Sequence, residues 1–234
     1  MEISERADLL KWMQANAEPA FARFSSALIP GLQRPMLGIR IPKLRSMARS
    51  LAKKDSHRAL HDLLTTETFE EVLLRGFVIG YAKAEWKDTW TEICNFVALI
   101  DNWEICDCCC SSFTAVRKHR DEVFPVLLRY LQSDKEYEQR FAVVMMMDHF
   151  LTDEYVEAVL NAWRRVRPRG YYVEMAVGWA LSVSFLSYRE ATLPLLLDEQ
   201  MPVACRKKAC QKILESKRTP AEWRSEIKSI KSKC

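Results

Sequence analysis

Glycine and proline are scarce in this sequence, with 6 Gly and 9 Pro among 234 residues. An average protein carries about twice that share. Tight turns depend on these two residues, so a chain with few of them has few turns and is unsuited to a many-stranded β fold. The scarcity favours long helices joined by short loops.

Long apolar segments are also missing. Residues 1–14 do not combine a basic stretch with an apolar one, so we expect no signal peptide. The longest dense apolar run, Phe141–Met147, is far shorter than the roughly 18 residues of a membrane helix. We therefore expect a cytoplasmic protein whose 8 Cys are thiols rather than disulfides.

The common cofactor and metal motifs are absent as well. The sequence has no glycine-rich nucleotide loop, no H-E-x-x-H zinc motif and no G-x-S-x-G nucleophile elbow. His57 and His61 can share a helix face but have no third ligand in pattern. Cys106, Cys109 and Cys110 lie at i, i+3 and i+4, which is typical of small buried helix residues, with metal or redox chemistry as the alternative. We expect no metal and no cofactor.

What is present is helical periodicity from end to end, with apolar residues three and four apart. Two segments, Thr68–Glu71 and Thr219–Glu222, match the capping box that starts a helix. Four segments resemble one another, the last three at a spacing of one helical hairpin: Arg75–Gly80, Arg140–Met145, Glu174–Trp179 and Lys207–Lys212. The sequence predicts an all-α fold, an α-solenoid of helical hairpins formed by residues 1–234 as one domain, with another helical bundle as the alternative.

Two pairs of residues spaced four apart predict specific features of the fold and the site. Trp103 and Asp107 share one face of a predicted helix, where an aromatic ring and a carboxylate together can receive a flat cation. The alternative is a core tryptophan with an exposed or capping aspartate. Gly76 and Gly80 predict a close approach of two helices.

Basic residues gather in three stretches, Arg34–Arg58, Arg164–Arg169 and Arg206–Arg218. Basic helix ends on a curved solenoid can follow a phosphate backbone, although a solvated helix face is the alternative for each stretch. The net charge of +4 permits nucleic-acid binding without requiring it. In the first stretch, Arg40, Lys43 and Arg45 are the predicted DNA contacts.

Six stretches in order along the chain carry a resemblance to a known family: Leu37–Arg45, Glu70–Lys83, Ile100–Asp107, Arg140–Asp148, Tyr171–Leu181 and Cys210–Ser216. They resemble the AlkD-type DNA alkylation repair family, bacterial alkylpurine DNA glycosylases built from HEAT-like helical repeats. The resemblance implies a monomer that grips duplex DNA on a concave face and hydrolyses the N-glycosidic bond of N3- and N7-alkylated purines. Such an enzyme need not pull the damaged base into a pocket. In a bacterial cell it is cytoplasmic, and nucleoid-associated when bound to DNA.

The resemblance also assigns roles to single residues. Trp103, Asp107 and Trp179 match residues that approach the deoxyribose of the lesion. Arg140 matches an arginine that contacts the DNA backbone beside the lesion. The chemistry agrees, because an alkylated purine is a cationic leaving group and a carboxylate with aromatic faces stabilises the charge that grows on the sugar. Two alternatives stay open: a non-catalytic HEAT-like module for duplex or branched DNA, and a protein-interaction scaffold.

Overall fold

The computed structural model describes residues 3–234, and every regular element within them is a helix. No β-strand occurs in these residues, which confirms the predicted all-α class. Tertiary contacts divide the chain into two compact units, residues 1–115 and 116–234. The one-domain organisation stays a prediction. Across residues 3–234, none of the helices combines the length and the apolar character needed to span a lipid bilayer.

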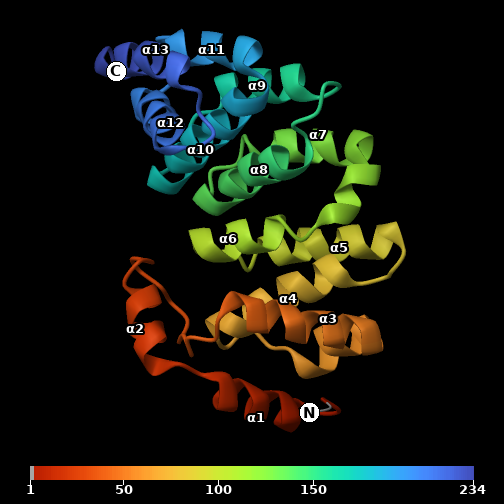
Figure 1. Ribbon diagram of the computed structural model, residues 1–234. Coiled ribbons are helices and arrows are strands. Elements are labelled where there is room, and N and C mark those ends of the chain that lie inside the picture. The colour runs from red at the N-terminus through yellow and green to blue at the C-terminus, as the bar shows by residue number, and fades with distance from the viewer. Residues whose placement is uncertain (1–2) are drawn as a thin grey trace. The chain divides into compact units, whose positions relative to one another are not determined.

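Within its described residues, the first unit contains six α-helices and one π-helix (Figure 1). They are α1 (Arg6–Asn16), α2 (Pro19–Ser26), α3 (Ile41–Arg58), the π-helix η1 (Ala59–Leu63), α4 (Phe69–Tyr81), α5 (Trp86–Val97) and α6 (Trp103–Cys110). Helix α4 packs against α3, α5 and α6, so side chains on nearly all of its faces are buried. It forms the centre of this unit's core.

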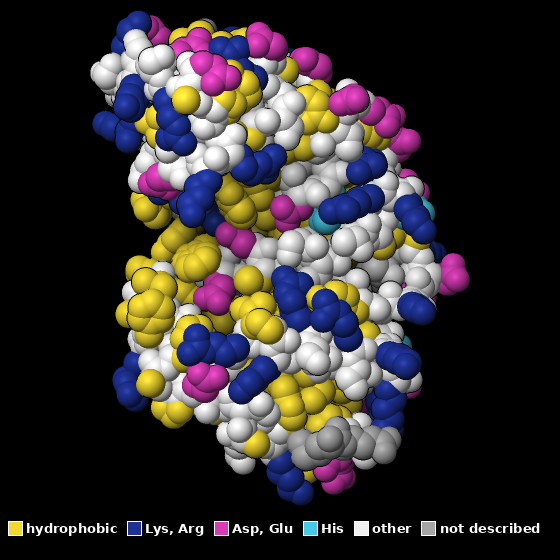
Figure 2. Space-filling model, in the orientation of Figure 1, with side chains coloured by type: hydrophobic (Ala, Val, Ile, Leu, Met, Phe, Trp, Pro, Cys, Tyr) yellow, Lys and Arg dark blue, Asp and Glu magenta, His cyan; other side chains and the backbone are white. Residues whose placement is uncertain are grey.

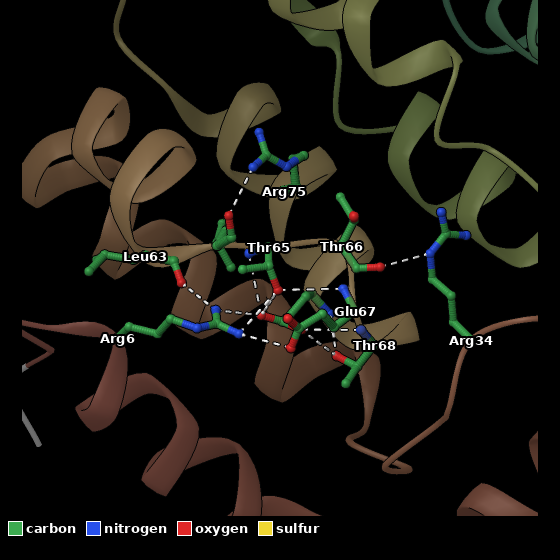
Figure 3. A network of polar contacts seen from close by, with 10 residues as sticks. Arg6, Arg34, Leu63, Thr65, Thr66, Glu67, Thr68 and Arg75 are labelled. Atoms are coloured by element: carbon green, nitrogen blue, oxygen red, sulfur yellow. Dashed lines mark hydrogen bonds and ion pairs between the residues drawn. The ribbon is translucent and has the colours of Figure 1, made fainter.

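The start of α4 is fixed by the capping box that the sequence predicts. Thr68 Oγ1 accepts the N–H of Glu71 at 3.2 Å, and Glu71 accepts the N–H of Thr68 at 3.2 Å. The buried Glu71 carboxylate also accepts hydrogen bonds from Arg6 and Thr65, both at 2.7 Å (Figure 3). Burial alone would raise the pKa of Glu71, but the bonds from Thr65 and Arg6 and the Arg6 charge hold this pKa below its ordinary value. One carboxylate therefore ties α1 to α4.

Glu71→Gln is expected to lower the free energy of unfolding by about 2–3 kcal/mol at pH 7, because Arg6 loses the buried one of its two carboxylate partners. A carboxyl group whose pKa is lowered by folding stabilises the protein above its ordinary pKa, and that contribution is lost as the pH falls through the lowered value. Wild type and variant should therefore converge in stability as the pH falls below about 5. Urea unfolding at each pH measures this difference.

Glu67→Gln is the matched control, because Glu67 contacts the same Arg6 at 3.3 Å but its side chain is 75% exposed. We expect it to cost less than about 0.5 kcal/mol and to leave the pH dependence unchanged. A stability difference between Glu71→Gln and wild type that stays constant below pH 5 would contradict the prediction.

The neighbouring carboxylate, Glu70, holds the loop between α2 and α3. Its buried oxygens accept the backbone N–H groups of Leu37, Gly38 and Ile39 at 2.7–3.2 Å. Three donors on one carboxylate satisfy a buried charge, and they fix the path of the loop. Helix α3 then begins with Pro42 in its first turn, where the missing N–H costs no hydrogen bond.

The second unit contains seven α-helices: α7 (Arg120–Tyr130), α8 (Glu136–His149), α9 (Val156–Arg165), α10 (Tyr171–Ser187), α11 (Arg189–Leu197), α12 (Val203–Glu215) and α13 (Ala221–Ser232). The short 3₁₀-helix η2 (Thr114–Lys118) leads into it. Helix α10 packs between α8 and α12 (Figure 1). The three segments that recur at hairpin spacing lie in these three helices, so the repeat corresponds to stacked equivalent helices, as in α-solenoids of helical repeats.

One predicted helix start in the second unit is wrong. Thr219 and Glu222 do not form a capping box, because the N-cap of α13 is Pro220 and no side chain caps the helix. The Thr219 hydroxyl instead donates to the carbonyl oxygen of Ile213 in α12. A threonine hydroxyl can bond either to the start of the following helix or to the end of the preceding one, and here it bonds to the end of α12.

Candidate active site

Helix α6 carries Trp103 and Asp107, and its first turn is fixed by Asn102. The Asn102 side chain accepts the N–H groups of Glu104 and Ile105 at 3.1 and 3.0 Å, as an N-cap residue does. Asn102 in turn donates to Asp101 at 2.8 Å, and Asp101 forms an ion pair with Arg34. The start of the helix is thus held by a chain of polar contacts.

Arg45 of α3 holds the other end of α6. Its guanidinium donates to the carbonyl oxygen of Cys108 at 2.9 Å, to Ser112 Oγ at 2.8 Å and to the Tyr81 hydroxyl at 2.9 Å. A cation at a helix C-terminus also compensates the negative end of the helix dipole. Arg45, predicted as a DNA contact, therefore has a positioning role inside the first unit, and a contact with DNA stays a prediction.

The pair of glycines in α4 sets the distance between α4 and α6. A Cβ atom on Gly76 would lie 2.8 Å from Cys109 Cβ, and one on Gly80 would lie 2.6 Å from the Ser112 carbonyl oxygen. Neither separation is compatible with a side chain, so α4 touches α6 at Gly76 and the backbone just beyond α6 at Gly80. This confirms the predicted close approach.

Trp103 and Asp107 are both half-buried on the same helix. The indole Nε1 of Trp103 donates to the carbonyl oxygen of Leu28 at 3.1 Å, which fixes the orientation of the ring. Asp107 lies one turn further along, so its side chain projects from the same face as Trp103. The two predicted residues are therefore neither buried in the apolar core nor separated from each other.

The segment at the end of α2 contributes side chains that the sequence analysis missed. Phe24 and Leu28 are large, apolar and 63% and 52% exposed. Leu28 contacts Trp103 through its carbonyl group, and Ser25 Oγ lies 3.5 Å from Glu104 Oε2. Figure 2 shows hydrophobic side chains gathered over α2 and α6, with acidic side chains among them. The first unit thus presents an apolar surface with carboxylates beside Trp103.

Glu104 is the second carboxylate of this surface. Burial raises the pKa of Glu104, and the nearby Glu70 and Asp107 charges raise it further, against the opposing hydrogen bond from Ser25. The Asp107 carboxylate beside the Trp103 ring gives this surface a negative charge. Such a surface favours a cationic group over a neutral one.

Arg40 and Lys43, the other predicted DNA contacts of the first unit, share one carboxylate. Arg40 Nε lies 3.0 Å from Glu18 Oε2, and Lys43 Nζ lies 3.7 Å from Glu18 Oε1. The Arg40 guanidinium also lies over the Phe21 ring at 3.6 Å. Both cations are exposed but partly neutralised, and their contact with DNA stays a prediction.

In the second unit, Arg140 and Trp179 lie on the stacked helices α8 and α10. Arg140 is only 5% exposed and donates from Nη1 to the carbonyl oxygen of Tyr172. Glu136, one turn earlier in α8, accepts the N–H of Tyr172 at 2.7 Å, so both side chains hold the start of α10. Little of the Arg140 side chain is exposed to a phosphate, and its contact with the DNA backbone stays a prediction.

Trp179 is half-buried in the middle of α10, where α12 approaches closely. A Cβ atom on the preceding Gly178 would lie 2.9 Å from the Cys205 carbonyl oxygen. The neighbouring helix therefore fixes the backbone that carries Trp179, while part of the indole ring remains accessible.

The cysteine cluster of α6 is packed rather than reactive. Cys106, Cys109 and Cys110 are fully buried, as the spacing predicts. Burial raises the pKa of Cys108 to about 12 and raises that of Cys109 well above its ordinary value. Protonated thiols are poor nucleophiles and poor metal ligands, which leaves Cys108 and Cys109 little reactivity. Cys106, Cys109 and Cys110 pack in the core.

The two histidines at helix spacing form a close pair on the surface of the first unit. The His57 and His61 rings lie 4.4 Å apart, and His61 Nε2 is 3.4 Å from Glu92 Oε1. Within residues 3–234, no three His, Cys, Asp or Glu side chains lie close enough together to hold a metal ion.

Comparison with known proteins identifies the family. The search of curated proteins gives no match. The family model described as DNA alkylation repair enzyme matches residues 9–213, which include Trp103, Asp107, Arg140 and Trp179. Because the match covers most of the chain, the protein belongs to the DNA alkylation repair enzyme family.

Proposed function

We propose that the protein is a monofunctional DNA glycosylase that hydrolyses the N-glycosidic bond of cationic N3- and N7-alkylated purines in duplex DNA. The observation that carries this proposal is the Trp103–Asp107 pair. A half-exposed indole and a carboxylate share one face of a helix that is held at both ends. Family membership supplies alkylated DNA as the context.

The proposed reaction needs little acid catalysis, because the alkylated purine already carries a positive charge. As the bond from C1′ to the purine nitrogen breaks, its electron pair moves to the base, which leaves neutral. Positive charge then grows on the deoxyribose, where the Asp107 carboxylate and the Trp103 ring face stabilise it. A water molecule adds to C1′, and Asp107 accepts its proton before releasing it to solvent. The products are a free alkylpurine and an abasic site.

Recognition without base flipping is part of the proposal. We compared five of the best-formed cavities on the described residues, and none of them is lined by Trp103, Asp107 or Trp179. A flipping enzyme encloses the extruded base in a pocket, whereas this surface suits the sugar and the edge of a stacked lesion. A role of Trp179 in the reaction, which the family resemblance implies, is part of the proposal and is tested by kinetics.

Release of methylated base tests the proposal. Purified protein is incubated with methylated duplex DNA, and free 7-methylguanine and 3-methyladenine are measured by chromatography. We expect release by the wild type and an about tenfold lower rate for Trp103→Ala and for Trp179→Ala, because each loses a ring face. Phe at either position should restore part of the rate.

Trp90→Ala is the matched control, because Trp90 stacks on Trp86 in α5 and has no proposed role. Its rate should equal that of the wild type. If the wild type binds methylated DNA but never releases methylated base, the glycosylase proposal fails, and the non-catalytic DNA-binding module takes its place.

A further inference from the structure

An open groove of about 710 Å³ lies at the C-terminal end of α3, within the first unit. Its lining comes from the last turns of α3 and from the segment where α4 ends. Four of the lining residues are cationic: Arg49, Lys53, Lys54 and Lys83. Asp55 is the one carboxylate among the lining residues, and it accepts the N–H of Arg58 at 2.9 Å.

Three of these cations form no ion pair within residues 3–234. Arg49, Lys53 and Lys83 are exposed, and none of them forms an ion pair with a carboxylate of residues 3–234. Arg40 and Lys43, earlier in the same basic stretch, share Glu18. The groove therefore gathers three cations without an ion pair in the described residues, whereas Arg40 and Lys43 are partly neutralised by Glu18.

The groove continues a line of cations that starts beside the candidate active site. Arg45, Arg49 and Lys53 follow one another at four-residue intervals, so they lie on one face of α3 about 6 Å apart along its axis. Arg45 bonds the Cys108 carbonyl at the end of α6. The Arg49 guanidinium lies 4.6 Å from the centre of the Tyr81 ring, which lines the groove.

The ligand chemistry follows from this layout. Separate, unpaired cations along an open groove match a chain of spaced negative charges better than a single small anion. We propose that this groove binds the phosphate groups of a polyanion, and that the polyanion is the backbone of duplex DNA beyond the lesion. The phosphate chemistry stands on the groove alone, whereas the identity of the polymer rests on the proposed function.

The test is the salt dependence of binding to undamaged duplex DNA, measured by fluorescence anisotropy. The double variant Lys53→Gln/Lys83→Gln removes two groove cations. The slope of log affinity against log salt should become shallower by about two, because each lost phosphate contact removes roughly 0.9 from the slope. Affinity at low salt should fall at least tenfold.

Lys11→Gln/Lys87→Gln is the matched control, with the same change in charge on exposed lysines of the first unit that do not line the groove. It should retain the wild-type slope. Calorimetric titration with inorganic tripolyphosphate forms a second arm, in which the groove variant should lose binding and the control variant should not.

The outcomes separate this inference from the glycosylase proposal. A slope change confined to the groove variant supports the inference even if no methylated base is released. Loss of tripolyphosphate binding with an unchanged DNA slope would mean that the groove takes a free polyphosphate, which overturns the assignment to DNA. Equal losses in both double variants, or no loss in either assay, would overturn the proposal altogether, whatever the rate of base release.

Discussion

Asp107→Asn is expected to bind alkylated duplex DNA as the wild type does and to release methylpurine at least 100-fold more slowly. The amide keeps the size of the side chain but removes the negative charge that stabilises the sugar in the transition state. Removing one such preorganised electrostatic contact typically costs about 10²–10³ in rate. Single-turnover release of 7-methylguanine measures the chemical step, and anisotropy measures binding.

Glu104→Gln provides the matched control for Asp107. Both carboxylates project from α6, but burial raises the pKa of Glu104, so it is less suited to carry a fixed charge. We expect a rate within about threefold of wild type for Glu104→Gln. Wild-type release by Asp107→Asn, or a larger loss in Glu104→Gln, would show that Asp107 does not act on the reaction.

The base-release rate of the double variant Asp107→Asn/Trp179→Ala tests whether the two side chains stabilise the same transition state. If they stabilise the same charge, the double variant should lose less than the product of the single losses. Strictly multiplicative losses would indicate independent roles. This cycle tests the role that the family resemblance assigns to Trp179 through kinetics alone.

The features predicted correctly from the sequence are local ones. The capping box of Thr68 and Glu71 depends on residues three apart, and the burial of Cys106 follows from apolar periodicity. The close contacts of Gly76 with α6 and of Gly80 with the segment just beyond it depend on residues that have no side chain. The pairing of Trp103 with Asp107 on one face needs only helical geometry.

The features that sequence reasoning missed depend on partners far away in the chain. Trp103 donates to Leu28, 75 residues earlier, and no local pattern predicts that bond. Arg45 is one more basic residue in the sequence, yet in the fold it holds the end of α6, 63 residues away. Because a side chain's role depends on what the fold brings beside it, charge alone assigned Arg45 to DNA.

Gly38→Ala is expected to lower the free energy of unfolding by about 3 kcal/mol or more. Gly38 has a φ of +82°, which costs a residue with a Cβ about 1–2 kcal/mol. The added Cβ would also lie 2.7 Å from the Ala22 backbone nitrogen and collide with the Glu18 carbonyl oxygen, and overpacking of this kind costs about 1–3 kcal/mol. Urea unfolding measures the total.

Gly31→Ala separates the two causes. Gly31 has nearly the same φ, +77°, but a Cβ there would meet no atom within 4 Å. It should therefore cost only the backbone strain, about 1–2 kcal/mol, and equal losses at both positions would show that the contact with α2 adds nothing. Because Gly38 contacts α2, and Leu28 just beyond α2 accepts the Trp103 hydrogen bond, Gly38→Ala should also slow base release. Gly31→Ala should retain the wild-type rate, since its added Cβ contacts no other residue and its strain stays local.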